Sequence, residues 1–167
     1  MTKKIALSSI FFTLFLGICW GQNLITVTKA PDMPRAVSGH FAGIQDGELQ
    51  TWGGCNFPDI PCADGGEKVF YPIAYGASVT VPEGTLYIGG TDGKSSLNDA
   101  GEGVPPLPKG LDNFAACYGM NRIFVAGGQT DGMPNTDVYA LDWPDGKEWV
   151  KLCELPDEGR LQPCMAV

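Results

Sequence analysis

The pattern of apolar and polar residues is most regular between residues 123 and 152. An apolar segment, 123–126, ends in the pair Gly127-Gly128, and a polar loop follows it. An alternating segment, 138–142, then leads into a Pro-Asp-Gly turn, and a last strand-like segment covers 149–152. Paired glycines at a strand end allow close backbone approach and positive φ, which side chains would obstruct. The pattern predicts one antiparallel sheet with its own turns.

Two earlier stretches repeat this pattern. ELQTWGG ends at Gly53-Gly54 and TLYIGG ends at Gly89-Gly90, and each follows a strand of small residues and a tight turn. A fourth copy begins at Arg160 with RLQPCMAV. Three glycine pairs, each after a hairpin pattern, resemble the kelch repeat, which forms a four-stranded blade of a β-propeller. The alternative is an all-β sandwich in which the glycine pairs recur by coincidence.

The spacing of the repeats departs from that of a kelch blade. The three glycine pairs, counted from Gly53, lie 36 and 38 residues apart, whereas kelch blades run to about 50 residues. Only the third repeat has all its expected strands. The fold class we expect is all-β, a kelch-type β-propeller with about three of an expected six blades and with outer strands missing in the first two. The blades are expected around 35–71, 72–104 and 107–155, with the start of a fourth at 160–167.

Missing outer strands leave open sheet edges, which invite association. We therefore expect self-association through exposed strand edges. Because three blades and a fraction cannot close a ring, we interpret the chain as an internally shortened and C-terminally truncated copy. The alternative is a genuine short propeller that completes itself by oligomerisation.

Residues 1–21 are expected to be a secretory signal peptide, and 22–167 the incomplete propeller. Lys3 and Lys4 form a positive start, and the apolar segment after them is short for a membrane span. The small residues Cys19 and Gly21 favour cleavage before Gln22. The expected location is periplasmic or secreted, with a lipoprotein and an uncleaved anchor as alternatives.

The chain is acidic, with a formal net charge of −8 at pH 7. A surface of this charge argues against nucleic acid or anionic membranes as partners, and it requires a local arginine for any acidic ligand. With a single histidine and no Cys-x-x-Cys spacing, we expect no metal site, and we expect no cofactor.

Five cysteines follow the predicted signal peptide, so they cannot all pair within one chain. Cys55 and Cys62 share one loop and form a disulfide in one interpretation. In the other interpretation the cysteines are free thiols, since Cys117 and Cys164 belong to apolar strands.

Five stretches make the resemblance narrower: PRAVSGHFAGI, GGCNFPD, GGEKVFY, AYGASV and RLQP. Together they resemble the cyclically permuted mutarotase group and are similar to N-acetylneuraminate epimerases, exported kelch propellers that interconvert the anomers of sialic acid. The resemblance implies a six-bladed propeller that binds an acidic or N-acetylated sugar at the mouth of its central channel. It also implies isomerase activity through general acid and base ring opening.

The same resemblance leaves the enzyme activity of this chain open. The proposed base of the family is a glutamate after a glycine, in a blade that a permuted chain reaches only beyond the end of this sequence. We therefore assign no catalytic residue and expect the chain to be inactive alone. The alternative is a non-catalytic kelch module that binds a glycan or a protein.

The candidate substrate-binding residues are polar positions near strand starts and glycine pairs: Arg160, Gln162, His40, Asn56, Tyr75 and Asn113. Arg160 and Gln162 match a polar pair at the start of an inner strand. A guanidinium binds a carboxylate through two parallel hydrogen bonds, so Arg160 is the candidate for an acidic group. Its alternative is a salt bridge with Asp157 or Glu158.

The remaining candidates are placed by analogy between repeats. His40 lies on an inner strand and is expected to face the mouth, with a structural histidine as the alternative. Asn56 follows the first glycine pair, where mouth loops are expected. Tyr75 and Asn113 precede the small-residue strands of two successive blades, and their equivalent positions predict a shared ring, although Tyr75 has a packing role as its alternative. Asp131 is expected to form a turn.

Overall fold

The computed structural model describes residues 28, 29 and 31–167. The predicted signal peptide, 1–21, and its cleavage site before Gln22 lie outside the described residues. The chain divides after Pro34 into two compact units, and the fold below is that of residues 35–167. No helix of the described part is long and apolar enough to cross a membrane.

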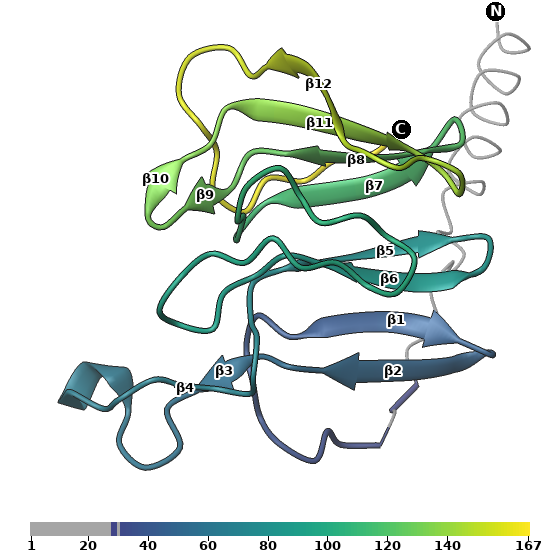
Figure 1. The fold of residues 1–167 in the computed structure, drawn as a ribbon. Helices are drawn as coiled ribbons and strands as arrows, with labels where there is room; N and C mark the ends of the chain where they lie inside the picture. Colours follow the sequence, from purple (N-terminus) through teal and green to yellow (C-terminus); the bar gives the residue numbers. More distant parts are fainter. Residues whose placement is uncertain (1–27, 30) are drawn as a thin grey trace, which may run out of the picture. The chain divides into compact units, whose positions relative to one another are not determined.

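Each repeat opens with an antiparallel strand pair (Figure 1). The pairs are β1 (Phe41–Gln45) with β2 (Glu48–Trp52), β5 (Ala77–Val81) with β6 (Gly84–Ile88), and β7 (Ala115–Gly119) with β8 (Arg122–Ala126). In the third repeat β11 (Asp137–Asp142) and β12 (Val150–Glu154) extend the pair to a sheet of order β12-β11-β8-β7. The expectation of an all-β, propeller-like fold is confirmed, with two-stranded sheets in the first two repeats and four strands in the third.

Short elements follow the glycine pairs. They are β3 (Cys55–Asn56) with β4 (Val69–Phe70), β9 (Gln129–Thr130) with β10 (Met133–Pro134), and the 3₁₀ turn η1 (Cys62–Asp64). β3 directly follows Gly53-Gly54, and β9 directly follows Gly127-Gly128.

The hydrophobic core lies between the second and third sheets. Its fully buried side chains come from β5, β6, β8, β11 and the segment between β6 and β7: Val79, Ile88, Leu107, Leu111, Ile123, Val125 and Leu141. The first sheet joins the second through an aromatic cluster, in which Phe41 stacks on Trp52 at 4.3 Å and both rings meet Tyr87 edge-on. Consecutive sheets therefore pack face to face, as blades of a propeller do.

The glycine pairs are where consecutive repeats join. A Cβ on the first glycine of each pair would collide with a carbonyl oxygen at the start of the next repeat, as at Gly89, where the Leu111 oxygen would be 2.6 Å away. The second glycine donates its N–H to that same carbonyl: Gly54 to Ile73, Gly90 to Leu111 and Gly128 to Arg160, at 2.7–2.8 Å. Each first glycine also has a positive φ of 58–72°. Glycine is required here for both reasons.

The two short sheets differ at their outer edges. Residues between β6 and β7 cover part of the β6 edge through an Ile88–Ala100 bridge and through hydrogen bonds from Gly89 to Asp99 and from Gly101 to Tyr87. Among the described residues, no backbone hydrogen bond beyond those with β1 reaches β2. The edge expected to be open is therefore partly covered in the second repeat and open in the first.

Asp137 ties the third repeat together. Its carboxylate accepts hydrogen bonds from Lys109 at 2.6 Å, from Lys151 at 2.7 Å and from Tyr139 at 2.8 Å. Lys109 first, then Lys151, hold the pKa of Asp137 well below its usual range. Burial, followed by the hydrogen bond to Asp137, raises the pKa of Tyr139 to about 12. The carboxylate thus joins β12 and the loop before β7 to β11.

We expect Asp137→Asn to lower the free energy of unfolding at pH 7 by about 1.5–3 kcal/mol, the size of a hydrogen bond to a charged group. Because the folded-state pKa of Asp137 is lowered, its stabilisation is complete above about pH 4 and fades as the pH falls below that. Urea unfolding at pH 7 and pH 3 should show a smaller difference between the variant and the wild type at pH 3, because part of the stabilisation is lost there. Asp142→Asn, which removes an exposed ion pair with Arg122, is the control and should cost less than about 1 kcal/mol. Equal losses from both substitutions would contradict this role of Asp137.

Gly89→Ala tests the close approach between repeats. We expect it to cost about 1–3 kcal/mol more than Gly103→Ala, because overpacking adds to backbone strain. Gly103 also has positive φ, but a Cβ there has nothing within 4 Å. Comparing the two variants by thermal or urea unfolding separates the strain, which both share, from the collision, which only Gly89 has. A Gly103→Ala variant as unstable as Gly89→Ala would show that positive φ alone accounts for the recurring glycines in this chain's repeats.

Candidate functional site

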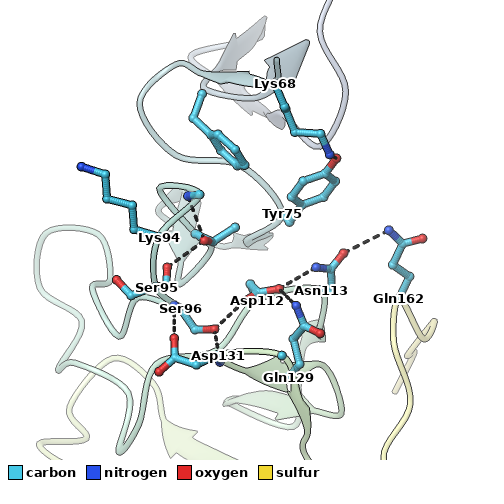
Figure 2. Close-up of a pocket in the computed structure, with 14 residues that line it drawn as sticks. Lys68, Tyr75, Lys94, Ser95, Ser96, Asp112, Asn113, Gln129, Asp131 and Gln162 are labelled. Atoms are coloured by element: carbon cyan, nitrogen blue, oxygen red, sulfur yellow. Dashed lines mark hydrogen bonds between the residues drawn. The ribbon is translucent and has the colours of Figure 1, made fainter. Parts of the chain in front are cut away.

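A cavity of about 460 Å³ lies where the end of the first repeat, the second and third repeats and the start of the fourth meet (Figure 2). Its walls are largely polar, with hydroxyl, amide, carboxylate and ammonium groups. The lining residues used below are Lys68, Tyr75, Lys94, Ser96, Asp112, Asn113, Gln129, Asp131 and Gln162.

A chain of backbone hydrogen bonds aligns the repeats at this cavity. Tyr75 N–H donates to Gly39 O at 2.8 Å, Asn113 N–H to Tyr75 O at 2.7 Å, and Gln162 N–H to Asn113 O at 2.7 Å. All four residues have positive φ, between 50° and 62°. They are therefore one position repeated four times, and the repetition brings Tyr75, Asn113 and Gln162 to one wall.

Asp112 forms the floor of the cavity and is only 2% exposed. Its Oδ1 accepts hydrogen bonds from the side-chain amides of Asn113 at 2.6 Å and Gln129 at 2.9 Å, and its Oδ2 accepts one from the Ser96 hydroxyl. Its backbone pairs with that of Gln129 in both directions. A buried carboxylate is costly unless it is hydrogen-bonded, and these three donors satisfy it.

Ser96 and Asp131 link the two repeats across the floor. The Asp131 N–H donates to Ser96 Oγ, and the Ser96 N–H donates to Asp131 Oδ1, each at 2.7 Å. Asp131, expected to be a turn residue, has the positive φ of one, 48°, and its carboxylate also borders the cavity. The reciprocal pair fixes the loop 91–96 against the third repeat.

Lys68 and Tyr75 lie on the opposite side from the floor (Figure 2). Lys68 Nζ donates to Tyr75 Oη at 3.2 Å, and its ammonium lies over the rings of Phe57 and Tyr75. The hydrogen bond to Tyr75 raises the pKa of Lys68 above its ordinary value, so the ammonium stays charged at neutral pH. The thiol of Cys55 donates to the same Tyr75 oxygen at 3.3 Å. Tyr75 Oη thus accepts twice and keeps its own proton to donate.

The structure brings three of the six predicted site residues to this cavity: Tyr75, Asn113 and Gln162. Gln162 donates its side-chain amide to Asn113 Oδ1 at 3.0 Å. The shared ring inferred for Tyr75 and Asn113 from their equivalent positions corresponds to the hydrogen-bond chain described above.

The other three predicted residues do not line the cavity. Asn56 is held locally, donating to Ala36 O and accepting from the Tyr71 hydroxyl. His40 packs beside Gly54, and its Nδ1 is buried with no hydrogen-bond partner among the described residues. The side chain of Arg160 is exposed and forms no ion pair within the described region, so its role here is its carbonyl, which accepts from Gly128.

The sequence-based candidates did not include the residues of the cavity floor or the two lysines that line the cavity. Gln129 carried a usable signal, since it directly follows a glycine pair, as Asn56 nearly does in the first repeat. Asp112 and Ser96 carried none, because their contact spans 16 residues and follows from the loop path alone. In the part of the chain that the structure describes, no group of three or more His, Cys, Asp or Glu side chains is placed to hold a metal ion.

The sheets define an all-β, propeller-like protein. No protein-family model and no curated protein matches this chain. A solved structure named "Structure of YjhT" does match, with a TM-score of 0.55 and 18% sequence identity over 79% of this chain. The match covers 59% of the YjhT chain, so this chain spans somewhat less than two thirds of it. At this identity the likeness concerns the fold, and it supports a propeller-like relationship.

The cysteines of the described region are free thiols. Cys55 is fully buried beside Tyr75, while Cys62 is exposed in η1. The structure therefore has the free-thiol form of the two that the sequence left open. Burial raises the pKa of the Cys117 thiol, which slows its reaction with alkylating reagents.

We expect iodoacetamide to label Cys62, Cys153 and Cys164 in the native protein, because all three are exposed. Cys55 should be labelled only after unfolding, since reagents reach a buried thiol only when the structure opens. Peptide mass mapping under native and denaturing conditions measures this. A Cys55–Cys62 disulfide peptide in a non-reducing digest would contradict the free-thiol structure.

Proposed function

We propose that this protein is a sugar-binding propeller of the sialic acid mutarotase type and that the cavity at Asp112 holds an acidic or N-acetylated sugar. The observation that carries the proposal is the floor, where a buried carboxylate aligns two amides and a hydroxyl at one end of a polar cavity. Side-chain amides and hydroxyls offer the paired donors and acceptors that sugar hydroxyl and acetamido groups require. The motifs that resemble N-acetylneuraminate epimerases support the same sugar class.

The cavity also offers positive charge for an acidic group. Lys68 and Lys94 both line it, and no arginine does. The sequence-based proposal of Arg160 as the carboxylate ligand is therefore replaced by these two ammonium groups. A lysine binds a carboxylate as a point charge, without the two-bond geometry of a guanidinium.

Mutarotation requires a base for the anomeric hydroxyl proton and an acid for the ring oxygen. Tyr75 has a proton to donate, and Lys68 stabilises the oxygen that would be left behind. The proposal assigns the described residues to binding and orientation, and it assigns the base to none of them. Export of the protein and its association through the open edge of β2 remain part of the proposal.

A second candidate function is a non-catalytic glycan-binding module. The observation that favours it is the engagement of both cavity carboxylates, since Asp112 accepts three side-chain hydrogen bonds and Asp131 accepts one from Ser96 N–H. These hydrogen bonds hold the carboxylates in place to orient a ligand, and this candidate function assigns them no proton transfer. Anomer exchange distinguishes this candidate from the isomerase.

We expect N-acetylneuraminate to bind the wild-type protein and Gln129→Ala to weaken that binding about threefold to tenfold, the value of one lost hydrogen bond. Gln50→Ala, on the exposed strand β2, is the matched control and should bind as the wild type does. Ligand-observed NMR gives the affinities, and exchange spectroscopy in the same samples gives the rate of anomer interconversion. Exchange faster than in buffer supports the isomerase, and binding without faster exchange supports the glycan-binding module. Absence of binding to the wild type would refute the proposal.

A further inference from the structure

Asp112 differs from the residues at the same position in the other repeats. That position is defined by reciprocal backbone pairs, Ser38 with Cys55, Ala74 with Thr91, and Asp112 with Gln129. Serine and alanine satisfy the backbone geometry as well as aspartate does. The carboxylate of Asp112 is therefore not needed to join the repeats, and its burial at 2% exposure calls for another role.

An ionised carboxylate accepts hydrogen bonds and donates none. The amide nitrogens of Asn113 and Gln129 must therefore face Asp112 Oδ1, as the structure has them at 2.6 and 2.9 Å. The amide oxygens then face away from the carboxylate. Asn113 Oδ1 faces Gln162, whose amide nitrogen donates to it at 3.0 Å. The side-chain oxygen of Gln162 therefore faces away from Asn113.

The hydroxyl of Ser96 also has its hydrogen-bond partners within the floor. It donates to Asp112 Oδ2 and accepts the N–H of Asp131, so it has no proton left to offer a ligand. Among the described residues, no hydrogen bond reaches the side-chain oxygens of Gln129 and Gln162. The floor thus has two amide oxygens without a partner in the described region, beside the carboxylates of Asp112 and Asp131, and each amide keeps one further N–H. The positive charges of the cavity, Lys68 and Lys94, lie away from the floor (Figure 2).

We propose that Asp112 is a positioning residue that fixes which way the amides of Asn113, Gln129 and Gln162 face and leaves the oxygens of Gln129 and Gln162 for the ligand. The cavity then selects a ligand that presents hydroxyl or amide groups to the floor and an anionic group to Lys68 and Lys94. A ligand bound in the reverse sense places its anion beside Asp112 and Asp131, where like charges repel. The orientation of the ligand rests on the proposed function, whereas the orientation of the amides does not.

The first experiment needs no ligand. The side-chain NH₂ groups of Asn113 and Gln129 are assigned in ¹H–¹⁵N spectra of the wild type, Asp112→Asn and the control Asp142→Asn. Asp112→Asn keeps the shape of the residue and its backbone pairs but places an amide where an acceptor-only group stood. We expect both NH₂ signals to shift and exchange faster with solvent in Asp112→Asn and to stay unchanged in Asp142→Asn. Unchanged signals in Asp112→Asn would overturn the proposal.

The second experiment compares N-acetylneuraminate with its methyl ester, which lacks the charge. We expect the wild type to prefer the acid about tenfold, and Lys68→Gln to remove most of that preference. Asp112→Asn should weaken both ligands about tenfold and leave their ratio unchanged, because the floor contacts the neutral end. Equal affinity of Asp112→Asn and the wild type for both ligands would overturn the positioning role. If the wild type binds neither ligand, the proposed function fails while the amide spectra still decide the role of Asp112.

A third variant keeps the proposal testable if Asp112→Asn does not fold. Gln129→Glu retains an oxygen toward the cavity but turns a second oxygen toward Asp112 Oδ1, where the amide nitrogen now donates at 2.9 Å. We expect it to shift the Asn113 NH₂ signal and to weaken binding of the acid about tenfold, while Gln50→Glu on β2 does neither. Wild-type spectra and affinity in Gln129→Glu would show that Asp112 does not set the orientation of the amides.

Discussion

The rest of the structure depends on one backbone contact, in which a carbonyl from the next repeat fits against a glycine pair and accepts the second glycine's N–H. It recurs at Gly53-Gly54, Gly89-Gly90 and Gly127-Gly128. Because the contact uses main-chain atoms and the absence of a Cβ, it does not depend on how many outer strands a repeat has. Equivalent positions of successive repeats are 36, 38 and 49 residues apart, and all three junctions have the same geometry. The first two repeats are shorter at their outer strands, and their inner joint is intact.

The cavity follows from this joint. Two residues after each incoming carbonyl, the chain enters the left-handed region and donates to the preceding repeat, which places Tyr75, Asn113 and Gln162 in a row. Asparagine tolerates this conformation well, and its presence at one of these positions agrees with that preference. The repeated backbone position determines where these residues lie, and their side chains determine which chemical groups border the cavity. Of the residues that precede the ring in the first three repeats, only Asp112 carries a charge, so this position brings a buried carboxylate to the cavity at the third repeat alone.

The sequence predicted the parts of the molecule that the glycines determine. The strands of the third repeat, the two-stranded character of the first two and the equivalence of Tyr75 with Asn113 all follow from repeat register. Contacts that depend on the path of a loop could not be predicted from the sequence. Ser96 and Asp131, for example, are 35 residues apart, and no sequence pattern indicates their hydrogen bonds. Arg160 was chosen for its charge, whereas the structure uses its carbonyl at Gly127-Gly128 and leaves its side chain exposed. A motif resemblance gives the position of a residue and leaves open which of its atoms the fold uses.

The charges that line the cavity differ from what the net charge of the chain predicts. The formal charge of −8 predicts that an acidic ligand needs a local arginine, yet the cavity has two lysines, and the hydrogen bond to Tyr75 raises the pKa of Lys68. The buried carboxylate of Asp112 has only neutral donors, so its field is not cancelled by a bound cation. Coulomb interactions strengthen as the local dielectric falls, and the same group that orients the amides therefore also excludes an anion from the floor. In the proposed function, attraction of the anionic group to the lysines and its repulsion from Asp112 together give the ligand one direction of binding.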